Sequence, residues 1–484
     1  MIRQLVTLLV ATSLTACSLA PHYVRPELPV PPSWPVGDAY LAQSEATLPT
    51  VDYTDIFHDA RLQKIIVQAL ANNRDLRVAA ANIAVARATF HIQRAELLPE
   101  VDATAGYSHA HEGSASPNPG NSNTFSAGIG ITSFEIDLFG RIRSLTTAAQ
   151  NRYFETEAAA RATRLTMVGD IATTWLTYAS DKSLLKIAQD TADSAQRSVK
   201  LTKARLDGGI APRTDLDQAA NVLQTALSDL ATQKTAVAQD INALQLLVGA
   251  PIDPTLLPAS IDEVESSVAE LPAGLDSGVL LRRPDVLQAE YELRATNADI
   301  GAARAELFPK ISLTTLLGFA SSGLSNLFTS GAFNYSVAPN VNYPIFRAGA
   351  GKATVAQSKA QRDVALATYE KSIQTAFREV ADGLARRGTI ADQEKAQRAL
   401  TAAASDNYTL SDARYRGGID TFLADLDAQR SLYTAQRTLV ATQLAKATNL
   451  VTLYRTLGGD SQLEPTPSGP KPVSTPTPTP APAP

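Results

Sequence analysis

Cysteine, aromatic residues and net charge are all scarce in this sequence of 484 residues. Its single cysteine, Cys17, excludes an intrachain disulfide. The formal net charge of -5 comes without any strongly basic segment, which argues against a nucleic-acid partner. Aromatic residues make up only 6% of the chain, whereas alanine, glutamine and threonine are plentiful. Small side chains of this kind favour close packing of helices.

Patterns that indicate catalysis are also missing. No serine lies in a nucleophile elbow, and no glycine-rich phosphate loop is present. No two histidines have a ligand spacing on a helix, and the five are His22, His58, His91, His109 and His111. His109 and His111 are two apart on an expected strand, where a polar surface or a barrel lining is favoured over a metal site. We therefore expect no enzyme, no metal and no cofactor, and any energy for transport must come from a partner.

The N-terminus has the layout of a secretory signal peptide, which we assign to residues 1–16. A short basic start precedes an apolar run from Leu5 to Leu14, which is too short to span a bilayer. The small residues before Cys17 resemble a bacterial lipobox. That resemblance implies that Cys17 carries N-palmitoyl and S-diacylglycerol groups, since several acyl chains anchor a protein stably. Ser18 follows where aspartate would favour the inner membrane, so the resemblance implies the outer membrane; a plain signal peptide with an incidental cysteine is the alternative.

Both ends of the mature chain are rich in proline. Residues 17–52 contain the lipidated N-terminus and a stretch from Pro21 to Pro49, which we expect to form an extended tether against the body. Residues 460–484 consist largely of Pro, Thr, Ser and Ala from Pro465 onward. Such a composition cannot bury a core, so we expect a disordered tail.

The chain contains an internal repeat. The sequence RAELLP at 94–99 recurs 210 positions later as RAELFP at 304–309. The sequence ARLDGGI at 204–210 recurs 209 positions later as ARYRGGI at 413–419. Further matches in the same order are Asp215-Leu216-Asp217 with Asp425-Leu426-Asp427, and Leu138-Phe139 with Ile345-Phe346. The chain is therefore a tandem duplication, with repeats at 53–250 and 284–459 and a linker at 251–283.

The two repeats predict the same order of elements. A helix ends at a proline, and the expected ranges are 60–97 and 284–307. Two strands separated by a Gly/Ser/Asn-rich loop follow, at about 101–111 and 124–138 and at about 310–320 and 333–346. A very long helix then begins, which in the first repeat covers 141–206 without any proline. Its apolar residues recur every three or four positions, as in a coiled coil.

Each long helix ends at a pair of glycines, which indicates a helix terminus. These helix-turn positions are Gly208, Gly209, Gly417 and Gly418. Shorter helices at 214–247 and 421–457 return from them, so each repeat is predicted to form an antiparallel coiled-coil hairpin.

The number of strands points to an assembly. Membrane barrels use about eight strands or more, and every backbone group in a membrane must be hydrogen-bonded. Four strands in one chain cannot close such a barrel, so several chains must share one. The helices are too polar for lipid and too long for a globular core, which places them in the periplasm. The predicted fold class is mainly α with a transmembrane β-barrel, and the assembly is a conduit.

Several motifs together resemble the outer membrane factor family of TolC-like channels, and in particular its OprM/NodT-like lipoprotein branch in tripartite RND-type efflux systems. They are LRRPDV at 281–286, IGAARAELFP at 300–309, IDLFG at 136–140, RYRGG at 414–418 and LDAQ at 426–429. Phe134, where the family has tryptophan, and the acidic Asp425 depart from its pattern. The resemblance implies a homotrimer in which four strands per protomer form a twelve-stranded barrel on a tandem-duplicated coiled-coil tunnel. It also implies docking to a periplasmic adaptor and an inner-membrane RND-type transporter.

The family closes its tunnel at the periplasmic end, and the resemblance carries this gate to particular positions. They are Tyr415, Leu423, Asp427 and Arg430, with Asp215 and Asp217 as the expected partners from the first repeat. Asp427 and Arg430 are three apart and share a helix face, so three copies would form a ring of acid–base pairs. An adaptor that binds the open form better would break them. The alternative is that Asp427 and Arg430 form an ordinary solvated surface pair.

The predicted function is a passive exit duct that conducts small molecules such as drugs from the periplasm to the exterior. The exit duct of a type I-like protein or peptide secretion system is an alternative within transport. A structural coiled-coil envelope protein without a pore is an alternative of another class.

Overall fold

The computed structural model describes residues 18–40, 52–115, 119–269 and 276–473. The predicted signal peptide and Cys17 therefore lie outside the described residues. The chain divides into two compact units, one formed by residues 1–27, 82–157 and 288–369 and the other by residues 28–81, 158–287 and 370–484. Within the described ranges, no helix is both long and apolar enough to cross a membrane.

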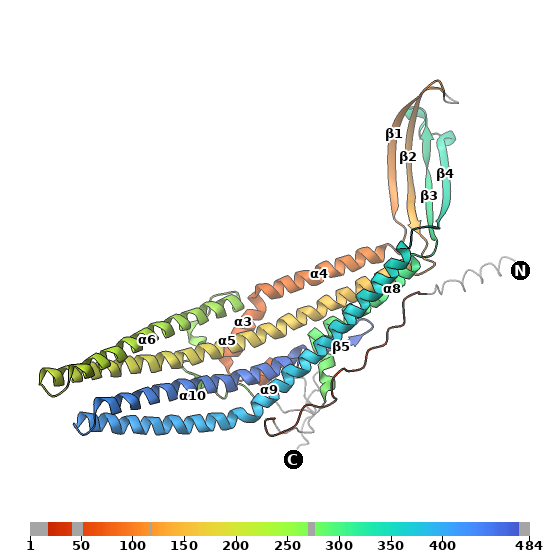
Figure 1. Ribbon diagram of the computed structural model, residues 1–484. Helices are drawn as coiled ribbons and strands as arrows, with labels where there is room; N and C mark the ends of the chain where they lie inside the picture. The colour runs from red at the N-terminus through yellow and green to blue at the C-terminus, as the bar shows by residue number, and fades with distance from the viewer. Residues whose placement is uncertain (1–17, 41–51, 116–118, 270–275, 474–484) are drawn as a thin grey trace, which may run out of the picture. The chain divides into compact units, whose positions relative to one another are not determined.

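The first unit contains an antiparallel sheet with the strand order β1-β2-β3-β4 (Figure 1). The strands are β1 (Val101–Glu112), β2 (Gly120–Glu135), β3 (Lys310–Ser321) and β4 (Phe333–Asn342). At the centre, β2 of the first repeat pairs with β3 of the second, with Gly128 opposite Gly318. A Cβ atom on Gly318 would lie 2.6 Å from the carbonyl oxygen of Ala127, so this close pairing requires glycine. β1 and β4 form the two edges of the sheet.

Two strands end earlier than predicted, β2 at 135 and not 138, and β4 at 342 and not 346. Beyond Glu135, the carboxylate of Asp137 accepts a hydrogen bond of 2.9 Å from the backbone N–H of Arg143, so these residues cap the next helix and do not extend the strand. Beyond Asn342, Pro344 has no N–H to donate to a ladder.

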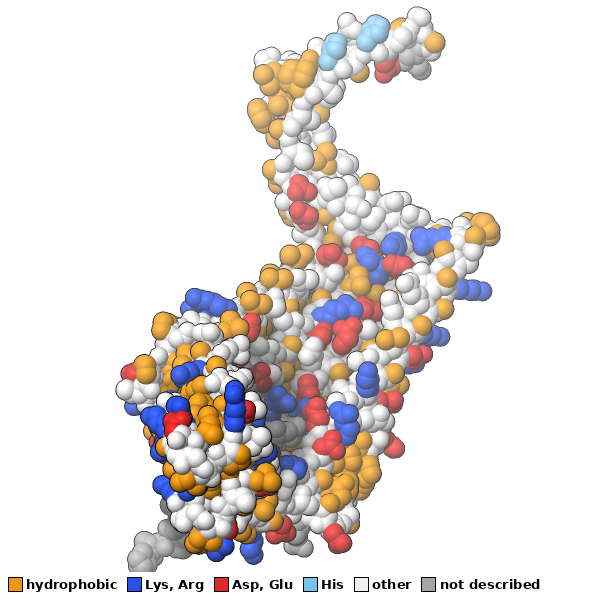
Figure 2. Space-filling view, turned by 60° about the vertical axis from the view of Figure 1, so that its left-hand side comes forward, with side chains coloured by type: hydrophobic (Ala, Val, Ile, Leu, Met, Phe, Trp, Pro, Cys, Tyr) orange, Lys and Arg blue, Asp and Glu red, His pale blue; other side chains and the backbone are white. Residues whose placement is uncertain are grey.

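The surface of the sheet differs from that of the helices. Figure 2 shows hydrophobic side chains gathered on the sheet, whereas most charged side chains lie on the helices. Large apolar side chains on the strands are more than half exposed in the single chain, and they include Tyr107, Ile129, Leu317, Tyr335, Val337 and Val341. A surface of this composition is suited to contact with lipid.

Two long helical hairpins contain the four longest helices of the described chain. The first joins α5 (Arg141–Asp207) to α6 (Arg213–Val248), and the second joins α9 (Ala350–Arg416) to α10 (Phe422–Thr456). The 67 residues of α5 span roughly 100 Å at the rise of an α-helix. In the first hairpin, Ala188 and Ala192 of α5 pack with Ala226 and Leu230 of α6. These small side chains let the two helices approach closely. The prediction of a mainly α fold with a sheet of four strands, two from each repeat, is confirmed.

The helix predicted at 60–97 is in fact two helices, α3 (Ala60–Asn72) and α4 (Arg74–Ala95). Asn73 separates them because its amide oxygen accepts from the backbone N–H of Leu76 (3.0 Å) and its amide nitrogen donates to the carbonyl of Leu247 (2.6 Å). Asparagine competes with the helix backbone in this way. The corresponding helix of the second repeat, α8 (Pro284–Ala305), is continuous.

Residues 18–40, which belong to the tether predicted at 17–52, contain no helix or strand and pack against helices, whereas residues 41–51 lie outside the described residues. In the first unit, Arg25 forms an ion pair with the buried carboxylate of Glu290 in α8. In the second unit, Trp34 is buried and its ring centroid lies 5.0 Å from that of Phe377. The short helices α2 (Tyr53–Ile56) and α7 (Ile261–Val264) also belong to the second unit.

Residues 460–473 differ from the disordered tail that was predicted at 460–484, and residues 474–484 lie outside the described residues. Strands β5 (Leu463–Thr466) and β6 (Gly469–Pro472) form a hairpin. Leu463 is only 1% exposed and packs with Ala158 and Leu287. One apolar side chain in a core position thus fixes a segment whose proline content predicted disorder.

Candidate gate at the ends of the helical hairpins

Both hairpins turn with the same backbone geometry. Gly209 and Gly418 each have φ +72°, a left-handed conformation that glycine adopts without steric cost. In the first turn, Ile210 N–H bonds to the carbonyl of Arg205 (2.8 Å), and the equivalent bond from Ile419 to Arg414 measures 2.9 Å. This is a Schellman arrangement, which pairs the last free carbonyls of a helix. Gly208 and Gly417 close the helices one residue earlier.

Tyr415 is buried inside the chain, where it joins the two hairpins. Its ring packs with Ala219 of the first hairpin and with Phe422 and Leu426 of the second. Its hydroxyl lies 3.2 Å from the hydroxyl of Thr202 in α5. This predicted gate residue therefore has its partners within one chain.

Arg205 at the end of α5 makes a second link to the same place. Its guanidinium lies over the ring of Tyr415, 4.3 Å from the centroid. Its Nη2 atom also donates to the carbonyl oxygens of Tyr415 (2.8 Å) and Arg416 (3.2 Å). A cation at the C-terminal end of α9 is favoured by the helix dipole.

Asp427 and Arg430 lie on an exposed face of α10. The closest carboxylate oxygen and guanidinium nitrogen are 4.0 Å apart, and the side chains are 65% and 62% exposed. A wet pair of this kind contributes at most about 1 kcal/mol to stability. Leu423 is also exposed, at 56%. Within one chain, therefore, the pair is solvated, and all three side chains are open to contact from outside the chain.

Asp215 and Asp217 lie near the start of α6. The first turn of a helix favours a negative charge such as that of Asp215. Asp217 pairs with Arg213, with 3.9 Å between the closest charged atoms, and both side chains are exposed.

The sequence profile of the outer membrane efflux protein family matches residues 65–250 and 276–459, once in each repeat and over most of the chain. The chain belongs to the outer membrane efflux protein family. It is 42% identical over 465 residues to a protein of Pseudomonas putida described as the toluene efflux pump outer membrane protein TtgC, covering 95% of this chain and 96% of that protein.

Solved structures resemble the chain over nearly its whole length. A membrane protein from Pseudomonas aeruginosa has 36% identity and a TM-score of 0.84, covering 91% of this chain and 100% of that one. The MtrE outer membrane channel of Neisseria gonorrhoeae, in its open state, has 33% identity and a TM-score of 0.81, covering 92% of this chain and 99% of that one.

This outer membrane efflux protein has a buried carboxyl group beside the predicted gate. Asp425 is 2% exposed, and its Oδ1 atom has no hydrogen-bond partner within the described chain. Burial, with a smaller effect of the negative charge of Asp412, raises the pKa of Asp425 to about 6, and the positive charge of Arg416 opposes this shift. The acidic departure from the family pattern at this position was the only signal for it in the sequence.

Two more tyrosines of the efflux protein connect its repeats. The hydroxyl of Tyr408 lies 2.7 Å from that of Ser194, and Tyr433 donates a hydrogen bond of 2.8 Å to Asp229. Burial, with a smaller effect of Asp229, raises the pKa of Tyr433 to about 12. Sequence reasoning did not select these tyrosines, or Arg205. The available signal was that Val199, Leu206 and Leu223 of the first repeat stand where the second has Tyr408, Tyr415 and Tyr433.

The histidine pair on β1 has polar partners across the sheet. Nδ1 of His109 lies 2.8 Å from Oδ1 of Asn123, and Nδ1 of His111 lies 2.7 Å from Oδ1 of Asn121. No group of three or more potential metal ligands occurs in the part of the chain that the structure describes.

Proposed function

We propose that this chain is the outer-membrane exit duct of a tripartite efflux pump, through which small molecules such as solvents and drugs leave the periplasm. Membership of the outer membrane efflux protein family supports this proposal. A relative with 42% identity is described as part of a toluene efflux pump, so small apolar compounds are the first cargo to test.

The observation that carries the duct is the open sheet. β1 and β4 are edge strands in the described chain, because the order is β1-β2-β3-β4 with no return pairing. Exposed edges with an apolar surface require a partner in a membrane. In a homotrimer, β4 of one protomer pairs with β1 of the next, and twelve strands close a barrel. The helical hairpins then form the periplasmic tunnel.

The gate of this duct lies at the hairpin ends. Asp427, Arg430 and Leu423 are exposed in a single chain, so each is available to the copies around the tunnel axis. Asp215 and Asp217 add negative charge from the first repeat, which favours cations over anions in the pore. A periplasmic adaptor and an inner-membrane RND-type transporter open the gate by binding the open form better.

A lipid on Cys17 anchors the chain in the same membrane as its strands. Support comes from the residues that directly follow it. The carbonyl of Leu19 accepts a hydrogen bond of 2.9 Å from Arg304, at the end of α8 and six positions before β3 begins at Lys310. Within the first unit, Leu19 therefore lies close in space to the residues that lead into β3, and an acyl chain two residues before it would reach the bilayer that holds the strands.

Conductance tests the duct directly. Purified protein that runs as a trimer should form channels when it is added to planar bilayers. The conductance of the unmodified protein should be low, because its gate is closed. A protein without a pore would give none. Deleting the gene should sensitise the cell to toluene or antibiotics; an unchanged susceptibility together with loss of a secreted protein would favour the secretion alternative.

The anchor has a separate test. The mass of the mature parent should include three acyl chains, and Cys17→Ser should lack them. If parent and variant have the same unacylated N-terminus, the anchor is excluded while the duct is unaffected.

A further inference from the structure

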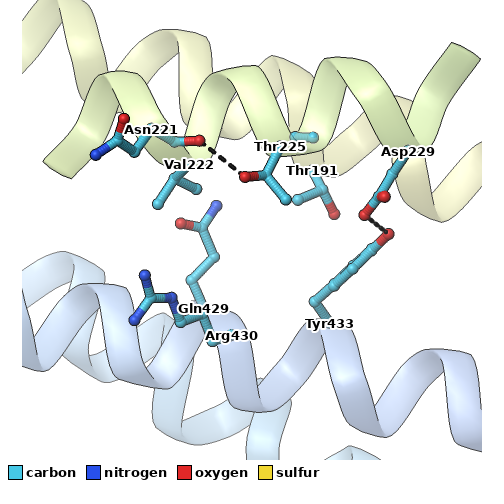
Figure 3. Close-up of a pocket in the computed structure, with 9 residues that line it drawn as sticks. Thr191, Asn221, Val222, Thr225, Asp229, Gln429, Arg430 and Tyr433 are labelled. Carbon is cyan, nitrogen blue, oxygen red and sulfur yellow. Dashed lines mark hydrogen bonds between the residues drawn. The ribbon is translucent and has the colours of Figure 1, made fainter. Parts of the chain in front are cut away.

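A cavity of about 170 Å³ lies between the two hairpins of the second unit, next to the predicted gate. Figure 3 shows its lining, which comes from α5 and α6 on one side and from α10 on the other. Val222 and Ala226 form an apolar wall, and the ring of Tyr433 closes one end. Arg430 of the exposed pair also lines it.

One polar group in this cavity has no partner. Gln429 is only 8% exposed, and its amide nitrogen makes no hydrogen bond within the described chain. Figure 3 shows the amide directed across the cavity from α10 toward α6. A buried hydrogen-bond donor without a partner lowers the stability of a protein. A ligand with a hydrogen-bond acceptor would remove this cost by pairing with the amide of Gln429.

Three hydroxyl groups of the lining are already engaged in hydrogen bonds within the chain. The hydroxyl of Thr225 donates to the carbonyl of Asn221 at 3.0 Å, and that of Thr191 donates to the carbonyl of Ile187 at 2.7 Å. The hydroxyl of Tyr433 donates to Asp229 at 2.8 Å, which occupies one oxygen of the only carboxylate in the lining. Apart from the side-chain amide of Asn221 and the second oxygen of Asp229, the groups left to bind a ligand are the amide of Gln429 and the guanidinium of Arg430, and this guanidinium carries the only positive charge of the lining.

We propose that this cavity is a binding site for a small carboxylate with a compact apolar body. The carboxylate accepts hydrogen bonds from Gln429 and Arg430, because a guanidinium binds carboxylates in preference to neutral oxygens. The apolar body lies against Val222 and Ala226. A cavity of roughly 150 Å³ accommodates a molecule the size of benzene, so a monocyclic carboxylate fits this volume.

Ligand-observed fluorine NMR with 4-fluorobenzoate tests the site on the full-length protein in detergent. Saturable binding in about the millimolar range is expected of a ligand this small. Gln429→Leu should weaken binding by about tenfold, because it removes the donor and keeps the size of the side chain. This variant also removes an unpaired buried donor, so it should fold at least as well as the parent.

Two controls keep the result specific. Gln436→Leu makes the same exchange two turns along α10, outside the lining, and should bind like the parent. The neutral probe 4-fluorobenzamide should bind several-fold more weakly than the benzoate, and Arg430→Gln should remove that difference. Absence of saturable binding, equal binding by Gln429→Leu and the parent, or equal binding of both probes to the parent would each overturn the proposal. None of these outcomes bears on conductance, so the duct is judged separately.

Discussion

The two hairpin ends share one backbone and differ in their side-chain partners. In the second repeat, Arg414 stays within its own turn and pairs with Asp420, at 2.7 Å. In the first, the equivalent Arg205 crosses to the other hairpin and binds the ring and carbonyl of Tyr415. Leu206 of the first repeat is only half-buried, whereas Tyr415 at the matching place is in the core. Both copies keep the same turn. Their side chains have diverged, so that an arginine of the first repeat now binds a buried tyrosine of the second.

The strongest test of this asymmetry compares Tyr415→Ala with Leu206→Ala. Removal of the buried ring should lower the free energy of unfolding by about 3–5 kcal/mol, since it leaves a cavity among Ala219, Phe422 and Leu426. The matched change at half-buried Leu206 should cost no more than about 2 kcal/mol. Denaturant unfolding followed by helical circular dichroism measures both. Equal losses would mean that the two ends are equivalent.

The arginines provide the next test. Arg205→Ala should destabilise the protein by about 2–3 kcal/mol, because it removes charge-assisted bonds to two helix-terminal carbonyls and a cation–π contact. Arg414→Ala breaks an ion pair at the surface and should destabilise the protein less than Arg205→Ala does. The same denaturation experiment applies, and a larger loss at Arg414 would reverse the assigned roles.

Lowering the pH should raise the free energy of unfolding through protonation of Asp425, at the end of the second hairpin. Its folded pKa of about 6 lies above the ordinary value, so the folded protein binds more protons than the unfolded chain between these two values. The stabilisation is present at low pH and is lost as pH rises through 6. On raising pH from about 5 to about 7.5, the free energy of unfolding should fall by on the order of 1–2 kcal/mol. Asp425→Asn should reduce the total fall by this amount, whereas the repeat-matched Asp215→Asn should leave the total unchanged. Burial also raises the pKa values of Asp240 and Glu292 to about 7, so these two groups account for a fall that remains in both variants.

The smallest effect on stability is expected at the exposed pair. Asp427→Ala and Arg430→Ala should each change the free energy of unfolding by less than about 1 kcal/mol. Their conductance in planar bilayers should nevertheless rise above that of the parent if they close the tunnel between copies. Variants that stay as closed as the parent would show that the gate lies elsewhere, for example at the hairpin contacts of Tyr415.

Local patterns predicted most of the fold, because helices, strands and turns depend on nearby residues. The glycine pairs and proline-free stretches placed both hairpins within a few residues of their observed ends. The break at Asn73 was not predicted because it depends on the distant carbonyl of Leu247. The hydrogen bonds that Tyr415 forms with Thr202 and Arg205 likewise join residues more than 200 positions apart in the chain. Periodicity identifies a face that packs, but it does not identify the particular side chain that packs there.

The buried leucine of the C-terminal hairpin determines how far the chain can be shortened at its C-terminus. The match to the family profile ends at residue 459, yet Leu463 fills a core position against Ala158 and Leu287. A protein trimmed at the homology limit would present that apolar site to water and would be prone to aggregate. An affinity tag or reporter is therefore best attached beyond residue 473, and the smallest stable version of the protein is longer than the family profile indicates.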